Sequence, residues 1–430
     1  MKIILINKFL YPKGGDAICA LTTGQLLRDK GHEVHFWGMN HPKNPEYPYK
    51  ELFIDRLDLD SRHSVKKQFS IAGKLLYSME AKRKIEKFIH IVGKPDMVHL
   101  HNFAHQISPS ILDVFKKFNI PCVMTMHDYK IVCASYLLLS HGRICTRCSG
   151  GNYYQCLLQS CVKNSRIKSM LNTIEMYLHH KVLRNYDYIH TFISSSRFLL
   201  NTVETMGFKK RIVHIPNFID LSRVTPCYDA KENSICYVGR LSYEKGVETL
   251  IKTFKCMEEE KKAQRHRGTE AQSEKNEKEF QDLKLKIIGT GPMEAALKAQ
   301  IAGCQNISFL GYKTGDDLKN EIRNSMFCVI PSEWYENNPL SVLEAFALGK
   351  PVIGAGIGGI PELVKDNVTG LTFESGNAED LQEKITTLVK NPEKIRQMGQ
   401  NSRKYIEEEF NSEIYYQKLM KVYQAGLDRI

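Results

Sequence analysis

The chain has 430 residues, 42% of them hydrophobic and 25% charged, which indicates a globular protein with room for two or three domain cores. We expect no membrane span, because no stretch approaches ~18 uninterrupted apolar residues, and no signal peptide, because the N-terminal apolar run is short. The net charge of +12 favours a phosphorylated substrate or an anionic membrane surface. The basic residues are scattered and no aromatic–basic RNA-binding module is present, so no nucleic acid partner is expected.

The first half of the chain alternates predicted strands and helices. Its opening run, KIILIN at residues 2–7, predicts a buried strand, and residues 17–31 predict a helix that ends at Gly31. Further apolar or β-branched runs predict strands at residues 33–38, 97–102, 122–128 and 188–196.

The pattern restarts after a Pro-containing joint at residues 215–217. Strands are predicted at residues 234–240, 283–289, 307–311, 327–332 and 351–356, with helices between them. Strands that alternate with helices form parallel sheets covered on both faces. The sequence therefore predicts an α/β protein of two doubly wound Rossmann-like domains that face each other across a cleft, with ligands at the carboxyl ends of the strands.

We place the N-terminal domain at residues 1–215 and the C-terminal domain at residues 216–411. Each carries an insertion: a Cys-rich segment at about residues 133–161 and an almost wholly polar stretch at about residues 258–282. We expect the polar stretch to be a solvated helical extension or a mobile loop. The amphipathic end of the chain, residues 412–430, is expected to pack back on the N-terminal domain.

The most informative residues are Glu336 and Glu344, which share the segment SEWYENNPLSVLEAFALGKPVIG. Pro339 suits the first helical position and Gly349 the end of the helix, so Glu336 precedes the helix and Glu344 lies about two turns from it. The start of such a helix offers unpaired N–H groups and the positive end of the helix dipole to an anion such as a diphosphate. Two surface glutamates at this spacing are common, and the neighbouring motifs favour the ligand site.

Two further loops suit an anion. Gly14 and Gly15 follow the first strand and let the backbone approach a ligand closely, although a glycine turn there is also a common architectural device. This is not G-x-G-x-x-G, and no acidic residue ends the next strand, which disfavours a dehydrogenase. Arg240 and Lys245 follow the strand at residues 234–240, where they can bind a phosphate or simply be exposed loop residues.

His127 ends a predicted strand and can hydrogen-bond a sugar hydroxyl or transfer a proton. His101 and His105 are weaker candidates, since the chain has 15 histidines and an isolated one is more often structural. The one Asp-x-Asp, at residues 58–60, is interpreted as a solvated loop, so no catalytic metal is predicted.

Twelve cysteines without an export signal indicate reduced thiols. Cys145 and Cys148 have zinc-knuckle spacing, and with Cys156 and Cys161 they could close a tetrahedral structural zinc site. Reactive or buried thiols are the alternative. The basic amphipathic helix expected at residues 163–183 could shape an acceptor site or touch a membrane, or pack as an ordinary helix.

Together these motifs resemble the retaining glycosyltransferases of family 4, which have the two-domain GT-B fold. The similarity covers essentially the whole chain, and only the combination of motifs is specific. The insertion, with Cys133 shortly after His127-Asp128, is similar to a polysaccharide-building branch of that family. The resemblance is carried by Gly14-Gly15, Thr125-Met126-His127-Asp128, Ile215-Pro216-Asn217, Gly239-Arg240-Leu241, Lys245-Gly246, the stretch from Glu336 to Val352, and Gly358-Gly359-Ile360-Pro361-Glu362.

The resemblance implies a donor-diphosphate site. Arg240 and Lys245 would neutralise the departing diphosphate, and the amides of Leu340, Ser341 and Gly15 would complete its binding. No metal is then needed for catalysis. In such retaining enzymes the acceptor attacks on the side that the diphosphate leaves, and a phosphate oxygen takes the proton.

The same resemblance assigns the nucleoside and the sugar. Glu344 would hold the ribose hydroxyls, and the backbone near Tyr312 and Lys313 would meet the base. His127 would reach a donor-sugar hydroxyl from the opposite domain. The other residues implied to contact the donor sugar are Glu336, Asn337 and Asn338.

The resulting hypothesis is a cytoplasmic glycosyltransferase, peripherally associated with the inner face of the membrane. It would move a sugar from a UDP- or GDP-linked donor to a lipid-linked or saccharide acceptor in capsule, exopolysaccharide or O-antigen synthesis. Two alternatives are another sugar-nucleotide enzyme with paired Rossmann domains, such as an epimerase or dehydrogenase, and a zinc-dependent nucleic-acid-binding protein. Neither explains the paired glutamates.

Overall fold

The computed structural model describes residues 1–57, 64–222, 224–266 and 283–428. They form two compact units. The first unit combines Met1–Asn217 with Glu413–Ile430, and the second spans Phe218–Ser412. The division after Asn217 lies at the end of the joint predicted at residues 215–217.

The first unit is built on six parallel strands in the order β2-β1-β3-β4-β7-β8. In β1 (Lys2–Asn7) all but the first residue are buried, and β4 (Cys122–Met126) is buried throughout. Uninterrupted apolar strands are typical of parallel sheets with helices on both faces. The other strands are β2 (Glu33–Gly38), β3 (Met97–Leu100), β7 (Thr191–Ser194) and β8 (Ile212–His214).

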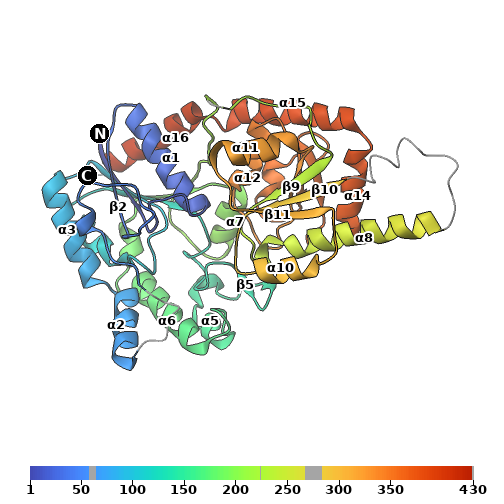
Figure 1. Ribbon diagram of the computed structural model, residues 1–430. Helices are drawn as coiled ribbons and strands as arrows, with labels where there is room; N and C mark the ends of the chain where they lie inside the picture. The colour runs from blue at the N-terminus through green and yellow to red at the C-terminus, as the bar shows by residue number, and fades with distance from the viewer. Residues whose placement is uncertain (58–63, 223, 267–282, 429–430) are drawn as a thin grey trace. The chain divides into compact units, whose positions relative to one another are not determined.

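Eight α-helices belong wholly or largely to the described part of this unit (Figure 1). The last helix, α16, packs on it: the Tyr415 hydroxyl lies 3.0 Å from Thr23 Oγ1, and the Tyr423 hydroxyl lies 2.7 Å from His99 Nδ1. The helices are α1 (Gly15–Asp29), α2 (Val65–Leu76), α3 (Met79–Val92), α4 (Leu112–Lys117), α5 (Tyr154–Leu158), α6 (Arg166–Tyr177), α7 (Arg197–Thr205) and α16 (Ser412–Leu427).

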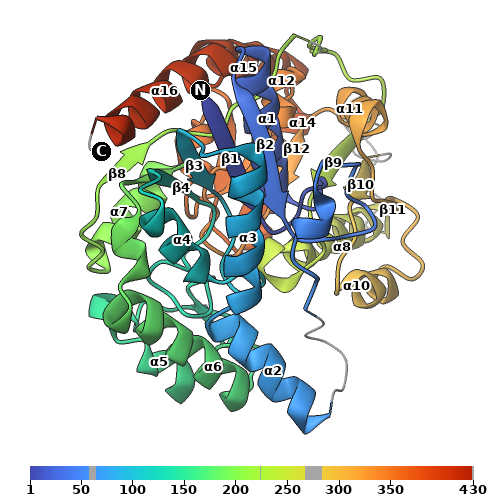
Figure 2. The ribbon, with the colours of Figure 1, turned by 90° about the vertical axis from the view of Figure 1, so that its left-hand side faces the viewer.

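The Cys-rich segment contains little regular structure. It holds a two-stranded hairpin of β5 (Leu139–Ser140) and β6 (Arg143–Ile144), one 3₁₀ turn at Ser149–Gly151, and the short α5. It leads directly into α6, and Figure 2 shows α5, α6 and α2 side by side.

The second unit is built on six parallel strands in the order β11-β10-β9-β12-β13-β14. Its core gathers buried residues of every strand, with Ile235, Leu285, Val329 and Ile353 fully inaccessible to solvent. The strands are β9 (Ser234–Val238), β10 (Lys284–Ile288), β11 (Ile307–Gly311), β12 (Cys328–Ile330), β13 (Val352–Ala355) and β14 (Gly370–Phe373). The helices are α8 (Val247–His266), α10 (Glu294–Gln300), α11 (Gly315–Asn324), α12 (Leu340–Ala347), α13 (Ile360–Leu363), α14 (Ala378–Val389) and α15 (Pro392–Glu409).

All the strands predicted from the sequence are present, and the two parallel Rossmann-like sheets confirm the predicted α/β class. The edge strands β8 and β14 were not predicted, because β8 has three half-buried residues and β14 begins at a glycine. Helix α8 extends to His266 into the predicted polar insertion. The rest of that insertion, residues 267–282, and the Asp-x-Asp at residues 58–60 lie outside the described residues.

Candidate functional site

The strand order of the second unit fixes where a ligand can bind. The chain leaves β9 toward β10 and β11 on one side, and toward β12, β13 and β14 on the other. In such sheets the crevice at the carboxyl ends of the two strands where the order reverses is the usual ligand site. Arg240 and Lys245 follow β9, and Glu336 follows β12, so these predicted residues lie at the switch point of this sheet.

Backbone contacts lock the loops after β9 and β12 together. Gly246 has φ of +65°, and a Cβ on it would lie 1.8 Å from the carbonyl oxygen of Pro331. The Glu333 N–H donates to the carbonyl oxygen of Glu244 at 2.9 Å. Only glycine at position 246 allows the two loops to come this close. Their contact holds Lys245 against the loop that carries Glu336.

Lys245 and Glu336 form an ion pair, with Nζ and Oε1 2.5 Å apart. Ser332 Oγ donates to the same carboxylate oxygen at 2.7 Å, and the ammonium lies 5.2 Å from the centre of the Trp334 ring. Burial raises the pKa of Glu336, but the Lys245 charge and these hydrogen bonds outweigh it and lower the pKa below its ordinary value. Glu336 is therefore an ionised, buried carboxylate beside a fixed cation.

The glycine motif after β13 fixes the backbone of Glu336. A Cβ on Gly358 would lie 2.5 Å from the Glu336 carbonyl oxygen, and the Gly359 N–H donates to that oxygen at 2.6 Å. The motif at residues 358–362 is part of the family resemblance. Its glycines support the loop that carries Glu336 and do not form a separate site.

Helix α12 begins at Leu340, one residue later than predicted, because Pro339 has an extended backbone. The N–H groups of Leu340 and Ser341 lie in its first turn, where a helix provides no acceptor. Gly349, with φ of +74°, ends the helix region as predicted. This helix start follows directly on the loop that holds Glu336, so an anion bound there would also meet the positive end of the dipole.

Glu344 differs from Glu336 in having no charged partner. Burial raises its pKa to about 7, while the more distant Lys319 opposes the shift. Its carboxyl group makes no hydrogen bond with any residue in the described ranges. A half-buried carboxyl group in this state can exchange a hydrogen bond with a ligand hydroxyl at neutral pH.

The other predicted donor residues of this unit have mixed environments. The Arg240 side chain is exposed and forms no ion pair with the described residues, while its carbonyl oxygen accepts from the Tyr237 hydroxyl at 2.8 Å. Tyr312 is exposed after β11. Lys313 Nζ lies 2.5 Å from Glu321 Oε1, so its charge is directed to α11. Two predicted residues are buried before α12: Asn337 and Asn338.

A glycine pair at the end of β10, Gly289 and Gly291, was not predicted from the sequence. A Cβ on Gly289 would lie 1.9 Å from the Gly239 carbonyl oxygen, and a Cβ on Gly291 would lie 2.2 Å from that of Leu241. The Leu241 N–H also donates to the Thr290 carbonyl oxygen at 3.0 Å. The available signal was Gly-Thr-Gly-Pro directly after an apolar strand, and its role is to hold the loop that carries Arg240.

In the first unit the strand order reverses between β1 and β3; Gly14 and Gly15 come after β1, whereas His127 follows β4, the strand next to β3. Gly14 precedes α1 and Gly15 begins it. His127 Nε2 lies 2.9 Å from His101 Nδ1, and the two rings stack. His101, His127 and Asp128 share a small cavity of about 20 Å³. Burial lowers the pKa of His127 to about 4, partly opposed by Asp16, so the imidazole is uncharged at neutral pH.

A second buried histidine extends this arrangement. His99 stacks on His101 with ring centres 4.4 Å apart, and its Nε2 lies 2.8 Å from Thr125 Oγ1. Burial lowers the pKa of His99 to about 3. His101, a weaker candidate in the sequence, is thus the packing partner of His127.

The four predicted zinc ligands are not gathered at ligand distance. Cys156 in α5 hydrogen-bonds Cys161, whereas Cys145 follows the exposed strand β6. Within the described ranges, the group with three potential ligand atoms inside 4.8 Å is instead Cys19, His101 and His127. The cysteines are nevertheless neighbours: after burial, the charges of Cys133, Cys161 and Cys145 all raise the pKa of Cys148.

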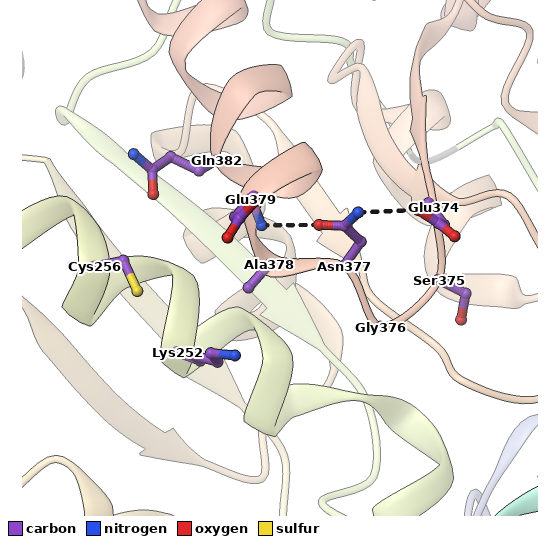
Figure 3. Close-up of a pocket in the computed structure, with 9 residues that line it drawn as sticks. All are labelled: Lys252, Cys256, Glu374, Ser375, Gly376, Asn377, Ala378, Glu379 and Gln382. Carbon is purple, nitrogen blue, oxygen red and sulfur yellow. Dashed lines mark hydrogen bonds between the residues drawn. The ribbon is translucent and has the colours of Figure 1, made fainter.

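A separate pocket of about 440 Å³ contains none of the predicted site residues (Figure 3). It lies at the start of α14, where the Asn377 carboxamide oxygen accepts from the Glu379 N–H and its nitrogen donates to Glu374. The bond from the Glu379 N–H to Asn377 caps the helix, so this part of the pocket wall has a structural role. Within the described part of the chain, no helix combines the length and apolarity that crossing a membrane requires.

Comparisons with known proteins agree with this geometry. Residues 13–223 match the family model Glycosyltransferase Family 4, and residues 227–405 match Glycosyl transferases group 1. N-acetyl-alpha-D-glucosaminyl L-malate synthase of Bacillus anthracis is 23% identical, covering 94% of this chain and 92% of its own. The capsular polysaccharide biosynthesis glycosyltransferase CapM of Staphylococcus aureus is 26% identical, covering 55% of this chain and 59% of its own.

A solved structure gives the fold. HepE of Anabaena in complex with UDP-glucose has a TM-score of 0.63 and 16% identity, and the match covers 99% of this chain and 100% of that one. The predicted GT-B class of two Rossmann-like domains is confirmed.

Proposed function

This chain is a glycosyltransferase with the GT-B fold, and on that premise we propose that it moves a sugar from a UDP- or GDP-linked donor to a lipid-linked or saccharide acceptor, with retention of configuration. The observation that carries the proposal is the Lys245–Glu336 pair at the start of α12, on the switch point of the second sheet. A buried ion pair beside unpaired helix amides suits a ligand with both an anionic and a hydroxylated part.

The departing diphosphate would be stabilised by positive charge already in place. Arg240 is exposed and Lys245 is anchored by Glu336, so one cation can turn to the ligand while the other keeps its position. The amides of Leu340 and Ser341 would add two hydrogen bonds. Charge fixed before the reaction stabilises the leaving group without reorganisation, so the proposal needs no catalytic metal.

The sugar and the nucleoside would meet different residues. Glu344, whose pKa of about 7 leaves it able to donate or accept, would bind the ribose hydroxyls. Glu336, Asn337 and Asn338 would contact the donor sugar, and the backbone at Tyr312 and Lys313 would contact the base. Gly15 and His127 belong to the first unit, and their donor contacts remain predictions from the family resemblance.

We further propose a place in surface-polysaccharide assembly, at the cytoplasmic face of the membrane. CapM is named for capsular polysaccharide biosynthesis, and HepE binds UDP-glucose, which supports a nucleotide-sugar donor and a saccharide product. The acceptor would attack from the side that the diphosphate leaves, and a phosphate oxygen would take its proton, so no side-chain nucleophile is assigned.

A structural zinc at Cys145, Cys148, Cys156 and Cys161 also remains a prediction, with no step of catalysis assigned to it. The four sulfurs would have to approach one another for it to bind. Elemental analysis of the purified protein tests it. One zinc per chain, lost in Cys148→Ser, is expected, and a zinc-free stable protein would refute it.

The proposed donor site is tested by screening nucleotide sugars for slow hydrolysis. One UDP- or GDP-sugar should be cleaved, and Lys245→Ala and Glu336→Ala should each reduce the rate by roughly a hundredfold. Lys298→Ala is the matched control, because Lys298 forms an exposed pair with Glu294 on α10. Equal rates in Lys245→Ala and the control would refute the proposed site.

A further inference from the structure

Helix α6 buries mainly polar residues and exposes aliphatic ones, which is the reverse of an ordinary surface helix. Its buried side is mainly polar: Ser169, Asn172 and Thr173 are buried there, beside Glu175 and one apolar residue, Met176. Its outward side is aliphatic: Ile167 is 76% exposed, and Met170 and Ile174 are each 45% exposed. A surface helix normally presents its apolar stripe to the core and its polar face to water.

Hydrogen bonds explain why the polar side faces inward. Asn172 Nδ2 donates to the Ala134 carbonyl oxygen at 3.1 Å, and Thr173 Oγ1 donates to that of Tyr153 at 3.2 Å. Ser169 Oγ accepts from the Val162 N–H at 3.0 Å. These bonds hold the Cys-rich segment, which has little core of its own. Since they set the rotation of α6, the aliphatic side chains are left outside.

A buried ion pair reinforces the same orientation. Lys130 Nζ and Glu175 Oε2 are 2.5 Å apart, and both side chains are almost inaccessible to solvent. Breaking such a pair by rotating α6 would leave Lys130 as an uncompensated buried charge. The outward aliphatic stripe is therefore a fixed property of this unit.

Neighbouring elements add further exposed apolar side chains. Helices α5 and α2 both pack against α6, and Figure 2 shows the three together. Each adds a strongly exposed apolar side chain, Leu158 at 64% and Phe69 at 75%, and the turn after α6 adds Val182 at 70%. We call this surface the α6 face; it comprises Phe69, Leu158, Ile167, Met170, Ile174 and Val182.

The charges around the α6 face have one sign. Between residues 163 and 184 the one acidic residue is Glu175, which is buried against Lys130. Two more exposed lysines, Lys66 and Lys67, begin α2. Just past the edge, Asp187 pairs with the last basic residue of the stretch. The exposed basic residues of the stretch are Lys163, Arg166, Lys168, Lys181 and Arg184.

We propose that the α6 face docks on an anionic phospholipid membrane, its aliphatic side chains entering the headgroup boundary and its basic side chains meeting the phosphates. A second copy of the chain is disfavoured as the occupant, because two basic faces would repel each other. The inference rests on the proposed function in its lipid-linked form, in which the acceptor is held at a membrane, and it assigns the membrane contact to particular residues.

Vesicle sedimentation of the full chain tests the proposal. The protein should bind vesicles of phosphatidylcholine with phosphatidylglycerol, and bind phosphatidylcholine alone far less. Ile167→Ser with Ile174→Ser, and separately Arg166→Glu with Lys168→Glu, should each lower the partition coefficient by roughly tenfold or more. The matched controls are Ile91→Ser, an exposed isoleucine on α3, and Lys404→Glu, an exposed lysine on α15; both should bind as the parent does.

Binding that both α6 double variants retain would overturn the proposal, as would a dimer of the parent that Ile167→Ser with Ile174→Ser dissociates. Thermal melting of each variant checks that the fold is intact. Lipid-free hydrolysis of the donor sugar separates this test from that of the proposed function. The α6 variants should hydrolyse at the parental rate, and a protein that binds vesicles but cleaves no nucleotide sugar would refute the function while leaving the surface intact.

Discussion

In the second unit the ends of β9 and β12 carry an ion pair, whereas in the first unit the ends of β3 and β4 carry two neutral, stacked histidines. After β9 and β12, the Glu336 carboxylate stays ionised because Lys245 supplies its counter-charge. For His101 and His127 after β3 and β4, burial is the largest influence and lowers their pKa values below the ordinary one, although Asp16 opposes the shift at His127. Similar parallel sheets thus create two chemical environments: nearby charge and hydrogen bonds outweigh burial at Glu336, whereas burial outweighs nearby charge at His127.

This comparison assigns different tasks to the two units. A fixed cation near a helix start suits the diphosphate of a donor, which is a charged group. A neutral imidazole suits hydroxyl groups, which it can meet without the cost of burying a charge. Changes that remove the pairing in one unit, or the neutrality in the other, should therefore have separate and measurable effects.

The largest effect is expected for Lys245→Ala. It leaves the Glu336 carboxylate buried without its cation, so we expect a loss of about 3 kcal/mol in the free energy of unfolding, along with the loss of donor hydrolysis. Denaturant unfolding and the hydrolysis assay measure the two effects.

A double variant separates stability from chemistry. Lys245→Met with Glu336→Gln removes both charges, so unfolding free energy should recover most of the loss while hydrolysis stays low. Recovery of hydrolysis in the double variant would show that the pair serves only the fold.

The next effect concerns the glycine that holds Lys245 in place. Gly246→Ala puts a methyl group into the Pro331 carbonyl oxygen at a positive φ, so the loops after β9 and β12 must separate. We expect a cost of about 3 kcal/mol and a reduced hydrolysis rate. Gly303→Ala is the matched control: its φ is +90° but a Cβ there meets nothing within 4 Å, so it should cost only about 1 kcal/mol. Equal costs would mean that the close approach is unimportant.

The alternation of apolar runs was enough to predict the two sheets, because a parallel strand is apolar along its whole length. The Lys245–Glu336 contact could not be predicted from local pattern, since the residues are 91 positions apart and meet only through the order of β9 and β12. The cysteine spacing predicted one zinc site, which stays a prediction; the fold places Cys156 beside Cys161, with Cys133 and Cys148 near enough to act on its pKa. The reversed polarity of α6 also could not be predicted from the sequence, because an amphipathic pattern does not show which side of a helix faces inward.

A smaller effect should appear in the pH dependence of stability. Burial raises the pKa of Glu344 to about 7, above its value in the unfolded chain, so the folded state holds this proton more tightly. The stabilisation of the folded state by this tighter proton binding at Glu344 is fully present below pH ~4.3 and is lost as pH rises through about 7. The difference in the free energy of unfolding, Glu344→Gln minus parent, should therefore be about 2 kcal/mol larger at pH 8 than at pH 5.

The control for this pH effect is Glu333→Gln, since Glu333 accepts a hydrogen bond from Thr249 Oγ1 in the same loop region. It should show no comparable gain between pH 5 and pH 8. Unfolding curves at the two pH values decide the matter, and a pH-independent effect of Glu344→Gln would contradict a raised pKa.

The smallest effect is expected at His127 and concerns the shape of a pH profile. With a pKa of about 4, the imidazole stays neutral between pH 6 and pH 8, so a hydrogen-bonding role predicts the same profile in the parent and in His127→Gln. The glutamine retains a donor and an acceptor, and the rate should fall roughly tenfold, with a larger fall in His127→Ala. In the parent, the pKa of His127 in the folded state lies below the unfolded value of about 6.5. The stability that the neutral imidazole contributes is therefore present above pH ~6.5 and is lost as pH falls through about 4. If the parent's rate profile shows an ionisation between pH 6 and pH 8 that is absent in His127→Gln, His127 would instead have a proton-transfer role. The contrast between the ion pair of the second unit and the neutral histidines of the first would then no longer hold.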